Sequence, residues 1–125
     1  NQAWEVNQQL CKLFPNKPSN LYMRGRILEQ QGKWKEAEET FRTLLACIQA
    51  SEYKSVGYQL ECHYRLALYL FKLGLFSQAL KECETALQLE SQRDASQELE
   101  GPLESVKEIL RNARKLQKEI REKGI

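Results

Sequence analysis

The sequence predicts an all-α protein in which helical hairpins follow one another along the chain. The first observation is an internal repeat, since Gly32-Lys33-Trp34-Lys35-Glu36-Ala37 returns as Gly74-Leu75-Phe76-Ser77-Gln78-Ala79. The second is a small residue seven positions before each glycine, Gly25 in one copy and Ala67 in the other. The third is apolar spacing of three and four residues through most of the chain, which is typical of amphipathic helices. Two such helices joined by a short glycine-containing turn pack as an antiparallel pair.

Both copies resemble the tetratricopeptide repeat, whose pattern is W-x₂-L-G-x₂-Y, then A-x₃-F, then P. The matching residues are Leu21, Arg24, Gly25, Leu28, Ala37 and Phe41 in the first copy, and His63, Leu66, Ala67, Leu70, Ala79 and Cys83 in the second. Leu21 and His63 stand where the family has Trp, and Cys83 replaces the aromatic residue. The resemblance implies a tetratricopeptide-like helical-hairpin array, an α-solenoid fragment, that acts as a protein-interaction module.

Length and composition fit a single soluble globular domain. The chain has 125 residues, of which 42% are hydrophobic and 29% charged. Its 19 basic and 17 acidic residues give a net charge of +2, too small to indicate nucleic acid or a membrane surface. No apolar run approaches the roughly 18 residues of a membrane span. We therefore expect neither a nucleic-acid nor a membrane partner.

The cysteine pattern favours free structural thiols. Cys11, Cys47, Cys62 and Cys83 are far apart and His63 is the single histidine, so the close ligand pairs of a zinc site are absent. Free thiols in apolar helical patterns behave as small hydrophobic groups. We expect no metal and no cofactor, and a reducing compartment, the cytoplasm with the nucleus as the alternative.

The chain is predicted to begin inside a repeat. Residues 1–14 have the apolar spacing of one helix, with a stripe formed by Ala3, Trp4, Val6, Leu10, Leu13 and Phe14. Ala3 and Pro15 are twelve residues apart, as are the alanine and the closing proline of the family. We expect residues 1–17 to be the second helix of a truncated repeat, and a chain that starts with Asn1 to be a fragment of a longer array.

Residues 18–57 are predicted to form a repeat with lengthened helices. Ser19 or Asn20 is the expected cap of a helix that ends near Gln31, and Lys33 is the expected start of the next. The two copies are offset by 74 − 32 = 42 residues, against about 34 in the family. The extra residues are predicted to add about a turn to both facing helices, with the connection near 53–56.

The rest of the chain is predicted to contain one more repeat and a long final helix. Residues 58–91 form the second repeat, with helices from about 57 to 72 and from about 77 to 90. Residues 92–125 begin like a third repeat, but Pro102 breaks the pattern. A long C-terminal capping helix follows to about 123, with an apolar stripe of Val106, Ile109, Ala113, Leu116 and Ile120.

The candidate site is the concave surface, which the resemblance assigns to the first helix of each pair. The residues expected there are Ser19, Tyr22, Met23, Arg26, Glu29 and Gln30, and Glu61, Tyr64, Arg65, Leu68, Phe71 and Lys72. From these we predict a peptide groove formed by Tyr22, Arg26, Tyr64, Arg65, Leu68 and Lys72. Tyrosine and arginine suit an extended acidic or C-terminal peptide. In the alternative, Tyr64, Leu68 and Phe71 only pack against the end helix or a neighbouring repeat.

No catalytic constellation is present, because no Ser, Cys or Asp is placed by the sequence to work with His63. His63 is expected to be a packing residue of its helix. The Lys-and-Asn clamp by which related repeats hold chaperone carboxylates is also absent, since Tyr22 and Arg26 occupy the first pair of positions. The end helix has a basic side, which keeps the end of the array soluble or contacts an acidic partner or nucleic acid.

Two functions follow from these patterns. The first is a scaffold, adaptor or co-chaperone-like module that binds a peptide of a protein partner on its concave face. The alternative is a structural segment that stacks on further repeats or self-associates through its C-terminal helix. An enzyme is not expected.

Overall fold

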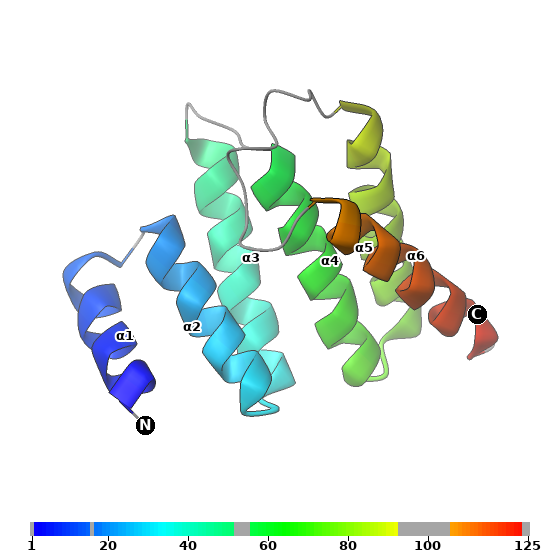
Figure 1. The fold of residues 1–125 in the computed structure, drawn as a ribbon. Helices are drawn as coiled ribbons and strands as arrows, with labels where there is room; N and C mark the ends of the chain where they lie inside the picture. The colour runs from blue at the N-terminus through cyan, green and yellow to red at the C-terminus, as the bar shows by residue number, and fades with distance from the viewer. Residues whose placement is uncertain (1, 16, 52–55, 93–105, 124–125) are drawn as a thin grey trace.

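The described part of the chain consists of helices joined by short connections. A computed structural model describes residues 2–15, 17–51, 56–92 and 106–123. The elements are α1 (Gln2–Leu13), α2 (Pro18–Gln30), α3 (Trp34–Ala50), α4 (Val56–Lys72), α5 (Phe76–Gln88), a 3₁₀ turn η1 (Leu89–Gln92) and α6 (Val106–Glu122). Figure 1 shows α1 to α5 side by side in chain order, each antiparallel to the one before, with α6 lying obliquely at the end of the array. The predicted all-α array of hairpins with a C-terminal helix is confirmed.

Both hairpins turn at a glycine with left-handed backbone. The φ angle is 73° at Gly32 and 81° at Gly74, a conformation that only glycine adopts without steric cost. In the first turn the Gly32 amide donates to the Glu29 carbonyl and the Lys33 amide to the Leu28 carbonyl, both at 3.0 Å. The equivalent bonds, 3.0 and 2.9 Å long, close the second turn. This is the double hydrogen bond of a Schellman C-cap, so the repeated sequence produces a repeated turn.

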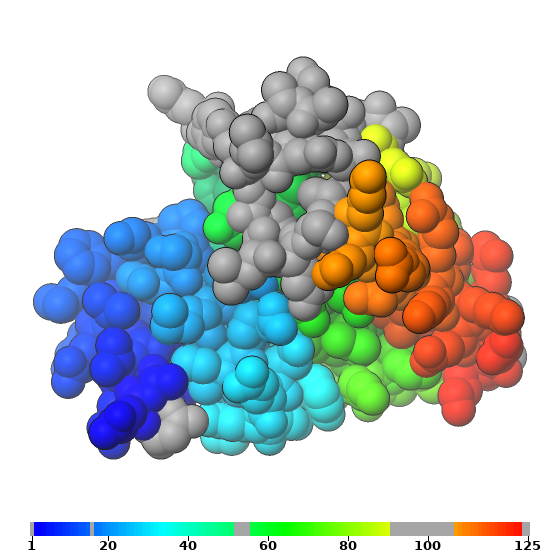
Figure 2. Space-filling view, viewed as in Figure 1, coloured from blue at the N-terminus to red at the C-terminus, as the bar shows by residue number. Residues whose placement is uncertain are grey.

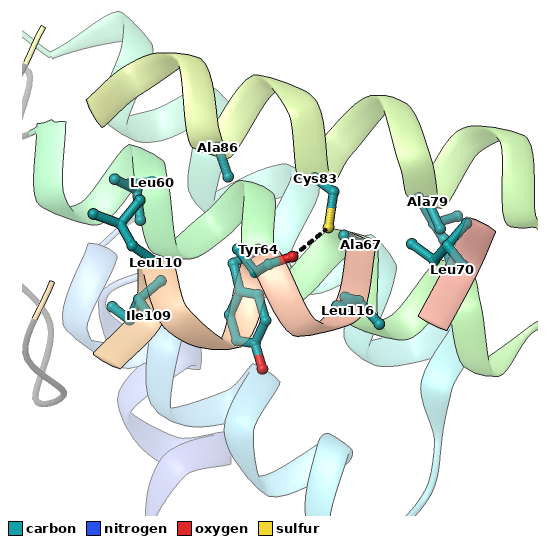
Figure 3. Close-up of a cluster of buried hydrophobic side chains, with 12 residues drawn as sticks. Leu60, Tyr64, Ala67, Leu70, Ala79, Cys83, Ala86, Ile109, Leu110 and Leu116 are labelled. Carbon is teal, nitrogen blue, oxygen red and sulfur yellow. Dashed lines mark hydrogen bonds between the residues drawn. The ribbon is translucent and has the colours of Figure 1, made fainter. Parts of the chain in front are cut away.

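The helices of the first hairpin approach closely because Gly25 has no side chain. A Cβ atom on Gly25 would lie 2.5 Å from Cδ2 of Phe41 and closer still to its Cε2. In the second hairpin Ala67 and Cys83 occupy the equivalent positions, and both are fully buried. The Cys83 thiol donates a 3.4 Å hydrogen bond to the Ala113 carbonyl of α6, drawn as a dashed line in Figure 3.

The core consists of two apolar clusters that share α4. One cluster joins α2, α3 and α4 around Phe41, Leu44 and Tyr69, and the other joins α4, α5 and α6 around Leu60 and Ile109. Leu68 packs against both clusters. α3 and α4 contain 17 residues each, whereas α2 and α5 contain 13. The two longer helices face each other in the middle of the array (Figure 1).

The helix starts differ slightly from those predicted. α2 begins at Pro18 with Lys17 as its N-cap, so neither Ser19 nor Asn20 caps it. Proline is favoured in the first turn, because its fixed φ is helical and its missing amide hydrogen would have no intrahelical partner there. α3 begins one residue later than expected, and α5 one residue earlier. The predicted break between Asp94 and Pro102 lies outside the described residues.

α1 leaves much of its apolar stripe in solvent. Val6, Leu13 and Phe14 are 55%, 71% and 54% exposed. The fully buried residue of α1 is instead Asn7, whose Nδ2 donates a 3.0 Å hydrogen bond to the Asn20 carbonyl. α1 is therefore attached to α2 in part through this buried polar contact, and Trp4 adds an apolar contact, since it is partly buried against the cluster of α2, α3 and α4.

Candidate functional site

Six polar side chains of α2 and α4 form a hydrogen-bonded group between these helices, here called the α2–α4 network: Tyr22, Arg26, Glu29, Glu61, Arg65 and Tyr69. Glu61 is one centre of the network. Its Oε1 accepts a 2.7 Å hydrogen bond from the Tyr22 hydroxyl and a 3.4 Å hydrogen bond from Nε of Arg65. Nη1 of Arg26 lies 3.8 Å from the same oxygen.

Glu29 is the second centre of the network. Its Oε1 accepts a 2.5 Å hydrogen bond from the Tyr69 hydroxyl, and Nη1 of Arg65 donates to both carboxylate oxygens at 3.4 Å. Arg26 completes the group, because its Nη1 donates to the Tyr22 hydroxyl at 2.8 Å and its Nε lies 3.7 Å from Glu29. Each arginine thus contacts both carboxylates, and the two positive and two negative charges balance.

Burial strengthens these contacts. Glu61 and Tyr69 have no exposed surface, and Arg65 is 5% exposed. Burial raises the pKa of the Tyr22 hydroxyl above its ordinary value, and the hydrogen bond to Glu61 raises it further. Burial likewise raises the pKa of Tyr69, with an added contribution from the negative charge of Glu29. Both tyrosines therefore stay protonated and donate to the carboxylates.

A pocket of about 170 Å³ lies between α4 and α6. This α4–α6 pocket is lined by Tyr64, Leu68, Phe71, Lys72, Asn112, Lys115, Leu116 and Glu119. Its walls combine apolar side chains with two lysines and one glutamate. Lys72 also lies over the Trp34 ring, with its Nζ 5.8 Å from the ring centroid. Figure 2 shows α2, α4 and α6 on one face of the molecule, coloured light blue, green, and orange to red.

The structure divides the six predicted site residues into two groups. Tyr22, Arg26 and Arg65 belong to the α2–α4 network, whereas Tyr64, Leu68 and Lys72 line the α4–α6 pocket. Tyr64 is also a member of the α4–α5–α6 cluster, and Leu68 and Phe71 pack against that cluster. The predicted alternative, packing of these three side chains against the end helix, therefore accounts for part of their surface.

The pairing of the arginines with Glu29 and Glu61 was not predicted from the sequence. The signal was present, because Arg26 and Glu29 are three residues apart and Glu61 and Arg65 are four apart, spacings that place charges side by side on a helix. Both glutamates were also expected on the same face as the arginines.

The remaining candidate residues have structural contacts. Nδ1 of His63 lies 2.9 Å from Oε2 of Glu82, which links α4 to α5. Cys11, Cys47, Cys62 and Cys83 are free. Within 2–15, 17–51, 56–92 and 106–123, no group of three His, Cys, Asp or Glu side chains is placed to hold a metal ion. In the same ranges no helix is long and apolar enough to cross a bilayer.

Sequential antiparallel hairpins, repeated glycine turns and a helix-lined face define a helical-repeat protein. The family model for the tetratricopeptide repeat matches residues 18–46 and 60–93. The chain belongs to the tetratricopeptide repeat family, whose repeats form protein–protein interaction modules and are typically non-catalytic. A search of curated proteins finds no match to the chain.

Proposed function

We propose that this chain is a non-catalytic interaction module whose α2–α4–α6 face binds an extended peptide of a partner protein. The observation that carries the proposal is the α4–α6 pocket, which brings Tyr64, Leu68 and Lys72 together with side chains of α6. At about 170 Å³ it is smaller than the roughly 300–1,000 Å³ of small-molecule sites. A single apolar side chain of a peptide fits this volume better than a cofactor or a metabolite.

The charges beside the pocket favour an acidic peptide. Lys72 and Lys115 are exposed and line the pocket, and Glu119 is the one carboxylate in its lining. A peptide carboxylate next to the inserted apolar side chain can accept charge-assisted hydrogen bonds from the two ammonium groups.

The α2–α4 network joins two of the three helices that form this face. It fixes α2 against α4 through buried charges, and the Arg26 side chain remains 27% exposed. Packed helices lie about 8–10 Å apart, so an extended peptide in the pocket can continue toward Arg26. In this proposal Arg65 positions Glu29 and Glu61 and does not itself contact the peptide, because it is buried among them.

The test is selection of random displayed peptides on the purified protein, followed by fluorescence anisotropy with the selected sequences. The variant Lys72→Glu/Lys115→Glu should weaken binding by at least about tenfold, because it replaces two exposed ion pairs by repulsion, and its melting temperature should stay near that of the parent. The matched control, Lys12→Glu/Lys81→Glu, reverses two exposed lysines outside the pocket and should bind like the parent. Equal binding by both variants would overturn the pocket as the binding site.

A structural role is the second candidate, and the exposed face of α1 favours it. The apolar stripe of α6 is buried within its own chain, with Ile120 and Leu116 at 0% and 5% exposure, while Leu13 of α1 is 71% exposed. Stacking or self-association would therefore use α1 and leave α6 in place. Sedimentation velocity tests this: a concentration-dependent dimer that Leu13→Glu abolishes supports stacking through α1, and a monomer at all concentrations contradicts it.

We also propose a cytoplasmic location, with the nucleus as the alternative. The four free thiols support it, because reducing compartments keep cysteines unpaired.

A further inference from the structure

α6 carries five basic side chains in one line, here called the outer basic stripe: Lys107, Arg111, Arg114, Lys118 and Arg121. All five are exposed. Their spacings alternate between four and three residues, so at about 100° per residue they fall within about 80° of the helix circumference. From first to last they span about 21 Å along the axis, at about 1.5 Å per residue.

The outer basic stripe points away from the protein core. Ile109, Ala113, Leu116 and Ile120 lie on the opposite side of α6 and are buried against α4 and α5. The α4–α6 pocket takes Asn112, Lys115, Leu116 and Glu119 from one flank of the helix, and none of these belongs to the stripe. Figure 2 shows α6, orange to red, at the surface of the molecule. The stripe is therefore a second surface, separate from the proposed peptide pocket.

Carboxylates border the stripe on both sides. On the flank of α6 nearer the pocket are Glu108, Glu119 and Glu122, all exposed. On the other flank, Glu90 lies 2.7 Å from Arg114, and the exposed Glu84 of α5 lines a common surface depression with Arg121. A broad anionic surface, such as duplex nucleic acid or a bilayer, would bring negative charge against these carboxylates. A ligand with a single narrow line of negative charge would avoid them.

We propose that the outer basic stripe binds an acidic helix of a partner protein, one that carries its carboxylates in a single line. Side chains on the same face of any α-helix recur at alternating spacings of three and four residues. An acidic stripe with this spacing can face the basic stripe over its whole length, because helices that pack at a shallow crossing angle stay in contact over several turns. The interaction is electrostatic, since the apolar side of α6 is already buried.

The experiment uses the full chain and two synthetic helical peptides of identical composition. One peptide carries glutamates at alternating spacings of four and three, and the other spreads them around the helix. Fluorescence anisotropy at low salt should show binding of the first at least about tenfold tighter than of the second. Because the contact is exposed, added salt should weaken it.

Two double variants separate the effect of the stripe from that of net charge. Arg111→Glu/Lys118→Glu reverses two stripe residues, and Lys81→Glu/Lys123→Glu reverses two exposed lysines that lie outside both the stripe and the α4–α6 pocket. The first variant should lose at least about tenfold in affinity, the scale of two exposed ion pairs replaced by repulsion. The second variant, and Lys72→Glu in the pocket, should lose less than about threefold. If the parent chain binds pocket peptides but not the patterned peptide, the stripe proposal alone is contradicted, and the reverse result contradicts the pocket proposal alone.

Three results would overturn the proposal. They are equal losses in the two double variants, equal binding of the two peptides, and tighter binding to a DNA duplex or to phosphatidylserine vesicles than to the patterned peptide. The last result would assign the stripe to a different class of partner.

Discussion

Glu61 has no exposed surface, and its charge is compensated by residues of two helices. Tyr22 from α2 and Arg65 from α4 both donate to its Oε1. A buried ion pair is a weak source of net stability, because desolvation offsets the attraction. Removing one partner is costly, however, since it leaves the other charge buried without compensation. The α2–α4 network therefore makes this pair of helices sensitive to single substitutions.

We predict that Glu61→Gln destabilises the protein by about 3 kcal/mol or more, because Arg65 keeps its charge and loses one of its two carboxylates. Urea denaturation measures the change in the free energy of unfolding. Glu84→Gln is the matched control, since Glu84 is exposed on α5, and it should change stability by no more than about 0.5 kcal/mol. Similar values for the two variants would mean that the network does not stabilise the fold.

At the residue scale, the sequence predicts which side chains share a face but not which of them pair. Arg26 and Arg65 are predicted groove residues, and they are part of the group that joins α2 to α4. The pairing depends on contacts such as Tyr69 to Glu29, 40 positions apart in the chain, and therefore on how two separate helices are placed by the core.

At the element scale, the hairpin turns are local structures. Each turn closes through hydrogen bonds between residues at most five positions apart, such as Leu28 and Lys33 in the first copy. A glycine with positive φ is enough to end one helix and redirect the chain into the next. This is why the sequence predicted both turns, whereas the exposure of α1 depends on which helices lie beside it and was not predictable from its own apolar pattern.

We predict a graded response at Gly32, whose φ is 73°. Gly32→Ala should cost about 1 kcal/mol, Gly32→Asn less, and Gly32→Val more, because asparagine tolerates left-handed backbone and a β-branched residue does not. Thermal denaturation followed by circular dichroism gives the order. The same series at Gly74 should give the same order, and an unranked series at either position would contradict the role of backbone strain.

At the scale of the whole molecule, α4 belongs to both core clusters. Cys62 is buried in the cluster of α2, α3 and α4, and Cys83 in the cluster of α4, α5 and α6. Burial raises the pKa of both thiols, that of Cys83 to about 12. Because Cys83 keeps its proton when folded, whereas the unfolded thiol ionises near 9.0, its contribution to stability is complete below that pH and is lost as the pH rises toward about 12.

We predict that the half-buried Cys11 and Cys47 react with a thiol reagent at pH 8 well before Cys62 and Cys83. The two buried thiols should react only through unfolding, with the same dependence on urea, because opening either cluster displaces α4. Variants that retain one cysteine each, with the others replaced by alanine, allow each rate to be measured by mass spectrometry. Different opening free energies for Cys62 and Cys83 would show that the clusters unfold independently.

Two hairpins with the same sequence pattern and the same glycine turn in one chain create a risk that a helix pairs with the wrong copy of its partner. The contact between Gly25 and Phe41, against Ala67 and Cys83 in the second hairpin, works against that error. If α4 took the place of α2 against α3, the Ala67 methyl group would collide with the Phe41 ring. If α2 took the place of α4 against α5, Gly25 would lie beside Cys83, and the missing methyl group would leave a void. The difference between the copies thus makes each helix pair selectively with its own neighbour. It disfavours mispairing within one chain and the exchange of hairpins between two chains.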